Sequence, residues 1–239
     1  MNNNNYVIIG ASGGIGRRLT LDLQAQGANL FLGYYSNQPP DQLLENAHYS
    51  QVDARSFERT IKFITDAKQR LGNIDGVVSL PGAILLKSPH LVSESEFDKL
   101  VDTNLKTAFS VIRAVGKLLK NSSTILMSTA AVHLGLSNHE AIVASKAGIE
   151  AMVRSASVTY ARKSIRFNAI APGLVDTPLS HNIISTPSSL EYSKKLHVTG
   201  KIGTPQDISN MIQFLLNSNN QWITGQIFTI DGGLSTTKK

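Results

Sequence analysis

The sequence predicts an α/β fold in which a parallel sheet carries helices on both faces. Segments typical of strands and segments typical of helices alternate along the whole chain, which is the order of repeated strand–helix–strand units. The strand segments are apolar on both faces, as a sheet covered from both sides requires. A glycine-rich turn follows the first strand directly.

The strands are short runs of apolar residues that end at glycine, polar residues or proline. The first, Tyr6 to Ile9, is followed at once by Gly10, which favours a buried strand. The second begins after Gly27 and Ala28, and the last stops before Asp231. The expected strands cover residues 6–9, 29–32, 49–53, 74–79, 124–128, 165–171 and 226–230.

The helices are predicted from apolar residues spaced three or four apart. Ile15, Leu19 and Leu23 follow this spacing, and Gly27 is a suitable C-terminal stop. The last helix starts with Thr204 as its cap and Pro205 at its first position. The expected helices cover residues 14–27, 57–72, 94–119, 138–162 and 205–216.

The 239 residues are expected to form a single domain, residues 1–239, with no repeat and no linker. The segment at about 179–199 is rich in serine and has few regularly spaced apolar residues. It is expected to be a mobile loop or a small helical lid.

The composition excludes several classes of protein. Without cysteine there is no disulfide framework, thiolate zinc site or cysteine nucleophile, and no metal site is expected. The net charge is +6, but the basic residues are scattered in pairs, so we expect no nucleic-acid binding. No apolar run is long enough for a membrane helix and residues 1–5 do not resemble a signal peptide, so a cytoplasmic protein with no membrane partner is expected.

The turn from Gly10 to Gly16 lies between the first strand and the first helix. Its glycines would let the backbone approach a pyrophosphate, whose charge the N–H groups of the new helix would receive. The alternative is a tight strand–helix connection with no ligand. The position directly after the first strand favours a dinucleotide site.

This turn resembles the cofactor loop of the short-chain dehydrogenase/reductase family, and several later motifs resemble other parts of that family's sequence. The similarity covers residues 6 to 233, and the order and spacing of the motifs agree. The matching features are the Gly10–Gly16 turn, Asp53, Asn104, and residues 144–148, 172–177, 203–207 and 224–233.

The resemblance implies a doubly wound Rossmann-type fold with seven parallel strands. It also implies an NAD(P)-dependent oxidoreductase that acts on a small carbonyl or alcohol substrate, commonly as a homodimer or homotetramer. The expected cofactor-binding residues are Gly10, Ser12, Gly14, Ile15, Gly16, Ser36, Asn37, Asp53, Gly82, Lys146, Pro172, Gly173, Val175 and Thr177.

The sequence favours NADP over NAD as the cofactor. An NAD site usually has an acid about 20 residues beyond the glycines, and residues 33–37 contain none. Ser36 and Asn37 could donate hydrogen bonds to a 2′-phosphate, with Arg17 supplying charge nearby. Alternatively, Ser36 and Asn37 are only turn formers before Pro39 and Pro40.

The resemblance assigns catalytic positions to Asn104, Lys146 and Thr129. Thr129 stands where the family has a serine, and Ser128 takes its place if the register differs by one. The family's proton donor is a tyrosine four residues before the lysine, and that position holds Ile142. Isoleucine has no proton to give, so this departure puts the proton-transfer step in question.

His139 is the expected substitute donor. It precedes Ile142 by three residues and Lys146 by seven, on the same helical face, and an imidazole titrates near neutral pH. Alternatively, residues 137–140 form a capping box in which His139 is merely exposed. His133, Tyr192 and water are the other candidate donors.

Two functions therefore remain open from the sequence. The first is an oxidoreductase with an altered proton donor. The second is a nucleotide-binding homologue without redox turnover, acting as a sensor, scaffold or partner subunit.

Overall fold

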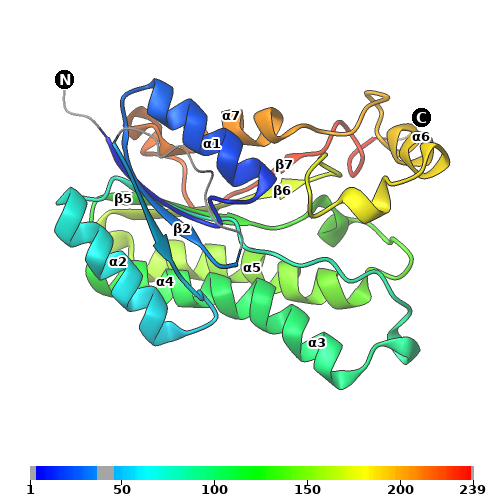
Figure 1. Cartoon of the computed structure of the whole chain (residues 1–239), viewed down its shortest axis with the longest axis horizontal. Helices are drawn as coiled ribbons and strands as arrows, with labels where there is room; N and C mark the ends of the chain where they lie inside the picture. The colour runs from blue at the N-terminus through cyan, green and yellow to red at the C-terminus, as the bar shows by residue number, and fades with distance from the viewer. Residues whose placement is uncertain (1–3, 37–45, 238–239) are drawn as a thin grey trace.

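The chain folds around one parallel sheet of seven strands in the order β3-β2-β1-β4-β5-β6-β7 (Figure 1). The computed structural model describes residues 4–36 and 46–237. The sheet confirms the predicted doubly wound α/β fold, because the strand order reverses between β1 and β4. The strands are β1 (Asn5–Ile9), β2 (Asn29–Tyr34), β3 (Ala47–Gln51), β4 (Gly76–Ser79), β5 (Ser122–Met127), β6 (Ile165–Pro172) and β7 (Ile227–Ile230).

Helices cover both faces of this sheet. In Figure 1, α1 and α7 lie above the sheet, and α2, α4 and α5 lie below it. The helices are α1 (Gly14–Ala25), α2 (Phe57–Leu71), α3 (Glu94–Val101), α4 (Thr107–Leu118), α5 (Glu140–Thr159), α6 (Pro187–Leu196) and α7 (Pro205–Leu216).

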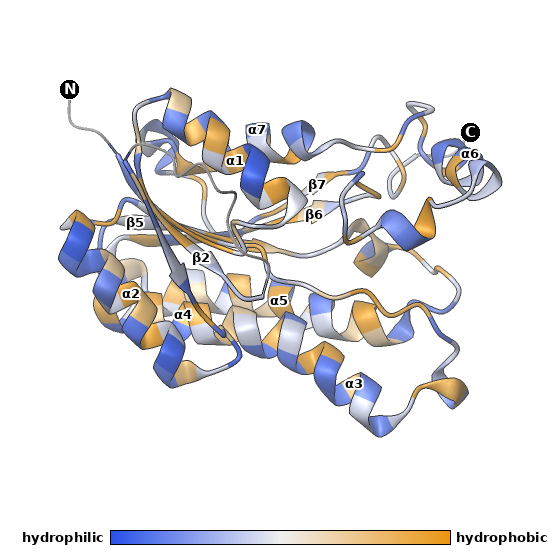
Figure 2. Cartoon of the chain, viewed as in Figure 1, coloured by the Kyte–Doolittle hydropathy of each residue, from blue (hydrophilic) through white to orange (hydrophobic). Residues whose placement is uncertain are grey.

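The core forms two layers because successive residues of each strand point to opposite faces. Along β1, Tyr6 and Ile8 pack toward α1 and α7, whereas Val7 and Ile9 pack toward α2, α4 and α5. The helices turn their apolar sides to the sheet, which Figure 2 shows as orange bands facing inward. The apolar strands that the sequence showed are thus buried on both sides.

The prediction of a single helix over residues 94–119 is wrong, because this range is not one continuous helix. It is divided into α3 and α4 by a wide π turn, Asp102–Lys106. The carbonyl of Asp102 accepts the backbone N–H of Thr107 and also the Thr107 side-chain hydroxyl, at 3.2 Å. A π turn inserted into a helix is often found at a functional site.

The alternative interpretation of residues 137–140 as a capping box is wrong. Helix α5 begins at Glu140 itself, and His139 is its N-cap without a side-chain cap hydrogen bond. Asn138 has a left-handed backbone with φ of 66°, which turns the chain before the helix can start. The helix is also shorter than the predicted range 138–162.

The segment at 179–199 contains a 3-10 turn (His181–Ile183) and α6. Thr186 and Ser189 form a capping box at the start of α6, with Pro187 at the first position. Figure 1 places α6 at the end of the molecule toward which the strands run. In the described part of the chain, no helix has the length and apolar character needed to cross a membrane.

Candidate functional site

A groove of about 540 Å³ lies where the strand order reverses. Its walls come from the carboxyl end of β1, the start of α1 and the loop after β4. Open α/β sheets bind their ligands at this place, because loops from neighbouring strands there turn to opposite faces and leave a crevice.

The start of α1 faces this groove without a capping side chain. Its N-cap is Gly13, and its first turn contains no acidic residue. By contrast, α3 and α7 begin with complete capping boxes that include Glu96 and Asp207. The first N–H groups of α1 and the positive end of its dipole are therefore available to an anion.

Glycine is required at two positions of this turn by close approach. A Cβ atom at Gly16 would lie 2.3 Å from the carbonyl oxygen of Gly10. A Cβ atom at Gly14 would lie 2.9 Å from Cγ2 of Thr177, which reaches across from the loop after β6. The bare backbone at the start of α1 fits the pyrophosphate of a dinucleotide cofactor.

Most of the residues predicted to bind the cofactor line this groove. They are Gly10, Ser12, Gly14, Ile15, Gly16, Ser36, Asp53, Gly82 and Thr177. Pro172, Gly173 and Val175 do not line the groove. Gly173 donates to the carbonyl of Ile230, and Val175 is buried and bridges to Gly203. Asn37 lies outside the described residues.

Asn104 links three segments at one end of the groove. It lies in the π turn and is almost fully buried. Its Oδ1 accepts a hydrogen bond of 2.9 Å from the Ala83 N–H, and its Nδ2 donates to the Ala83 carbonyl at 3.1 Å. Nδ2 also lies 3.3 Å from Oγ of Ser145 on α5. The loop after β4 is thereby fixed against both α5 and the π turn.

The side chains of Asn104 and Lys146 both lie close to Gly82, which has no side chain to fill the space near them. A Cβ atom at Gly82 would lie 3.3 Å from Oδ1 of Asn104 and 3.5 Å from Nζ of Lys146. Nζ donates a hydrogen bond of 2.9 Å to the carbonyl of Met127 at the end of β5. Burial lowers the pKa of Lys146 from its ordinary 10.5 to about 8.

The hydroxyl groups of Ser128 and Thr129 make different hydrogen bonds. Ser128 is buried and donates a hydrogen bond of 2.6 Å to Oε1 of Glu150, on α5. Thr129 is half-buried, and its Oγ1 accepts a hydrogen bond of 3.3 Å from the Ala131 N–H. That contact leaves the Thr129 hydroxyl proton able to hydrogen-bond a substrate oxygen.

The candidate proton donors lie in different surroundings. His139 is half-buried at the start of α5, with Nδ1 2.8 Å from the carbonyl oxygen of Ser137. Ile142 follows on the same helix and is buried. His133 is exposed and its Nε2 lies 3.3 Å from Oε2 of Glu150, while Tyr192 lies exposed on α6.

The opposite end of the groove contains a cluster of side chains that the sequence did not predict. Arg55 donates from Nε and Nη2 to the two carboxylate oxygens of Asp53, at 2.8 Å each. This contact is the main reason that the pKa of Asp53 lies below its usual value. Nη2 of Arg55 also donates to the Tyr35 hydroxyl at 2.7 Å.

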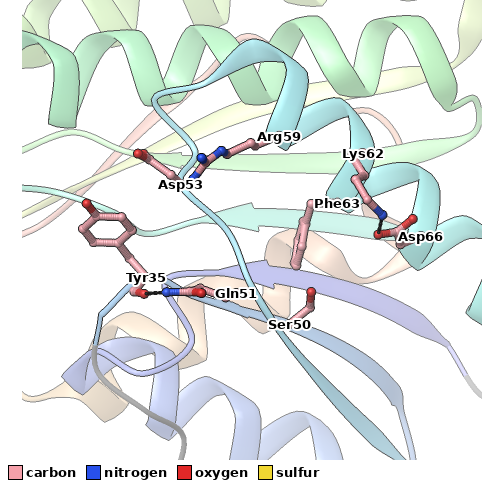
Figure 3. Close-up of a pocket in the computed structure, with 8 residues that line it drawn as sticks. All are labelled: Tyr35, Ser50, Gln51, Asp53, Arg59, Lys62, Phe63 and Asp66. Atoms are coloured by element: carbon pink, nitrogen blue, oxygen red, sulfur yellow. Dashed lines mark hydrogen bonds and ion pairs between the residues drawn. The ribbon is translucent and has the colours of Figure 1, made fainter.

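A second cavity, of about 230 Å³, adjoins this cluster and shares Tyr35 and Asp53 with the groove (Figure 3). Figure 3 shows Arg59 beside Asp53, and Lys62 paired with Asp66 further along α2. Among residues 4–36 and 46–237, no group of three or more histidine, aspartate or glutamate side chains is arranged to hold a metal ion.

The comparisons with known proteins agree with this geometry. A family model described as enoyl-(acyl carrier protein) reductase matches residues 10–235. The chain is 30% identical to a hydroxynaphthalene reductase-like protein of Metarhizium anisopliae, over 96% of this chain and 94% of the relative. It is 26% identical to L-rhamnose 1-dehydrogenase (NADP(+)) of Thermoplasma acidophilum, over 96% and 95% of the two chains.

Among solved structures, the chain is similar to ElxO with NADP bound, with a TM-score of 0.90 and 22% identity. The similarity covers 98% of this chain and 100% of the other. Three findings lead to one conclusion. They are the order of the seven strands, the glycine turn at the point where this order reverses, and the match of the family model over nearly the whole chain. The chain belongs to the short-chain dehydrogenase/reductase family.

Proposed function

We propose that this chain is an NAD(P)-dependent oxidoreductase that interconverts a small carbonyl compound and an alcohol, with an altered proton donor. One observation carries the proposal. The same groove that exposes the uncapped start of α1 reaches Gly82, beside Asn104 and Lys146. A dinucleotide held by its pyrophosphate at α1 would thus extend toward the side chains that the family uses for chemistry.

NADP is the proposed cofactor. No acidic residue stands at positions 33–36, where a carboxylate would repel a 2′-phosphate. The relative from Thermoplasma acidophilum carries NADP(+) in its name. Gly10, Ser12, Gly14, Ile15 and Gly16 would hold the pyrophosphate, with Thr177 at the nicotinamide end. Once bound, the nicotinamide would supply or accept the hydride.

Lys146 and Thr129 are proposed to orient the reacting groups. Lys146 is fixed by the Met127 carbonyl and would donate to the cofactor ribose. Thr129 would donate its hydroxyl hydrogen to the substrate oxygen. In reduction, the carbonyl carbon receives the hydride and the carbonyl oxygen receives one proton, so an acid must stand near Thr129.

His139 is proposed as that acid. Ile142 occupies the place of the family's tyrosine and has no exchangeable proton. In the cationic imidazole both ring nitrogens carry protons, and the contact of Nδ1 with the Ser137 carbonyl leaves Nε2 to deliver its proton. His133 is less suitable because its Nε2 faces Glu150.

The second candidate function is nucleotide binding without redox turnover. The buried, apolar Ile142 favours it, because an acid missing from this place would stop proton transfer while the cofactor groove remained complete. Such a chain could serve as a sensor, scaffold or partner subunit.

Two further expectations accompany the proposed enzyme. Phe109 on α4 and Val158 on α5 are exposed apolar side chains, which supports assembly into a homodimer or homotetramer through these helices. Residues 179–199, which include α6, are proposed to form a lid over the substrate. The substrate is proposed to be a small molecule and not a nucleic acid.

Purified protein is predicted to oxidise NADPH in the presence of at least one member of a panel of ketones and aldehydes. The measurement is the loss of reduced-nicotinamide absorbance together with mass-spectrometric detection of the alcohol. Binding of NADPH by calorimetry without turnover of any substrate would contradict the enzyme and favour the second function. In that case Ile142→Tyr should produce activity, because it returns a proton donor to an otherwise complete site.

His139→Ala is predicted to lower kcat by about 10²-fold or more and to change the dependence of kcat on pH, because the proton must then come from water. His133→Ala and Tyr192→Phe are the matched controls and should retain the wild-type pH profile. If His139→Ala keeps that profile, or if a control loses it, His139 is not the donor.

The stability of the wild type relative to Lys146→Met is predicted to rise as the pH increases from about 8 to 10.5. Below this window Lys146 is protonated in both states, and its burial as a cation costs stability. Within it, the folded protein loses this proton before the unfolded chain does, which removes a cost of about 3 kcal/mol. Urea unfolding measures the difference. Lys117→Met removes an exposed lysine and should leave the pH dependence of wild-type stability in place. If the difference in the free energy of unfolding between the wild type and Lys146→Met does not change with pH, the lowered pKa of Lys146 is contradicted.

A further inference from the structure

The end of β2 is the place where the structure distinguishes NADP from NAD, and this inference rests on the proposed cofactor role. Tyr34, Tyr35 and Ser36 line the groove there, together with Asp53 and Arg55 from the segment after β3. In a doubly wound sheet the residues at the end of the second strand face the adenosine ribose. The 2′ position of a bound cofactor would therefore face this group of side chains.

Arg55 is held at this end of the groove by three kinds of contact. Its Nε and Nη2 bind the Asp53 carboxylate in a two-point fork. Nη2 also donates to the Tyr35 hydroxyl, and the guanidinium carbon lies 5.0 Å from the centre of the Tyr35 ring. Stacking and forked hydrogen bonds orient the planar guanidinium before any ligand arrives.

The charge of Asp53 is balanced by two arginines. Arg55 contacts its carboxylate directly, and Arg59 lies beside it in the adjoining cavity (Figure 3). Both arginines help to lower the pKa of Asp53. Lys62, also in that cavity, is already paired with Asp66 at 2.6 Å. Asp53, Arg55 and Arg59 together carry a net charge of +1, so the acid does not make this end of the groove repel a phosphate.

We propose that Arg55, oriented by Asp53 and stacked on Tyr35, is the residue that selects a cofactor with a 2′-phosphate. The hydrogen bonds to Asp53 and Tyr35 use Nε and Nη2. In the described part of the chain, Nη1 has no hydrogen-bond partner, so its two N–H groups can donate to phosphate oxygens while the other contacts persist.

The structure favours Arg55 over the residues that the sequence suggested for this role. Arg17 does not line the groove, whereas Arg55 does. Ser36 lines the groove but is neutral, and a neutral hydroxyl distinguishes a phosphate from a ribose hydroxyl less strongly than a guanidinium does. The selective group therefore comes from the segment after β3, while Ser36 can add a hydrogen bond.

Two adenosine fragments test this proposal without any turnover. They are 2′,5′-ADP and 5′-AMP, which differ only in the 2′-phosphate, and their dissociation constants are measured by calorimetry. The wild type should bind 2′,5′-ADP more tightly by about tenfold or more. Arg55→Gln should weaken 2′,5′-ADP by about 10- to 100-fold and change 5′-AMP by less than about twofold.

Three variants complete the test. Arg17→Gln is the matched control and should change both affinities by less than about twofold. Arg55→Lys keeps the charge without the fork and should fall between wild type and Arg55→Gln. Arg59→Gln should weaken 2′,5′-ADP less than Arg55→Gln does. Thermal unfolding of each variant confirms that it is folded.

Four results would overturn the proposal. The first is an equal loss of affinity for both fragments in Arg55→Gln, which would mean that Arg55 only holds Asp53. The second is a loss of affinity for 2′,5′-ADP in Arg17→Gln. The third is a wild type with no preference for 2′,5′-ADP, and the fourth is a wild type that binds neither fragment. The proposed function fails differently, when the wild type binds neither NADPH nor NADH. Binding of both cofactors with equal strength, unaffected by Arg55→Gln, would contradict the role of Arg55 and the preference for NADP, but not NAD(P)-dependent activity.

Discussion

The free backbone N–H groups at the start of α1 are the constraint on which the rest of the site depends. The helix has neither a capping side chain nor an acid in its first turn, and Gly16 and Gly14 admit no Cβ atom. An anion is the natural partner of such a terminus. Because the strand order reverses beside it, the groove continues from this point in two directions, toward Tyr35 and toward Gly82.

The two ends of the groove are built by different physical means. At the Gly82 end, buried hydrogen bonds from Asn104 and Lys146 to backbone carbonyls fix the loop after β4 and the end of β5. At the Tyr35 end, charges on flexible side chains are held by pairing and stacking at a partly exposed surface. The first end is therefore suited to precise positioning, and the second to discrimination between ligands of different charge.

The sequence predicted features that depend on local residues and missed those that depend on distant contacts. The strands and the glycine turn follow from short patterns, and the structure has them. The π turn at Asn104 could not be predicted, because the apolar spacing on either side is that of one continuous helix. Arg55 stands only two residues after Asp53, but its hydrogen bond to Tyr35 forms only when β2 and β3 pair. Residues 137–140 have the pattern of a capping box, but the left-handed backbone of Asn138 starts the helix two residues too late for one.

Hydride transfer in this groove would need a proton donor, and we propose that His139 supplies the proton in place of a tyrosine at position 142. A crystal structure with NADPH bound tests this claim most directly. We expect Oγ1 of Thr129 and Nε2 of His139 both to face the space beside C4 of the nicotinamide. A bound cofactor whose C4 is surrounded only by Ile142 and other apolar side chains, with His139 turned to solvent, would contradict it.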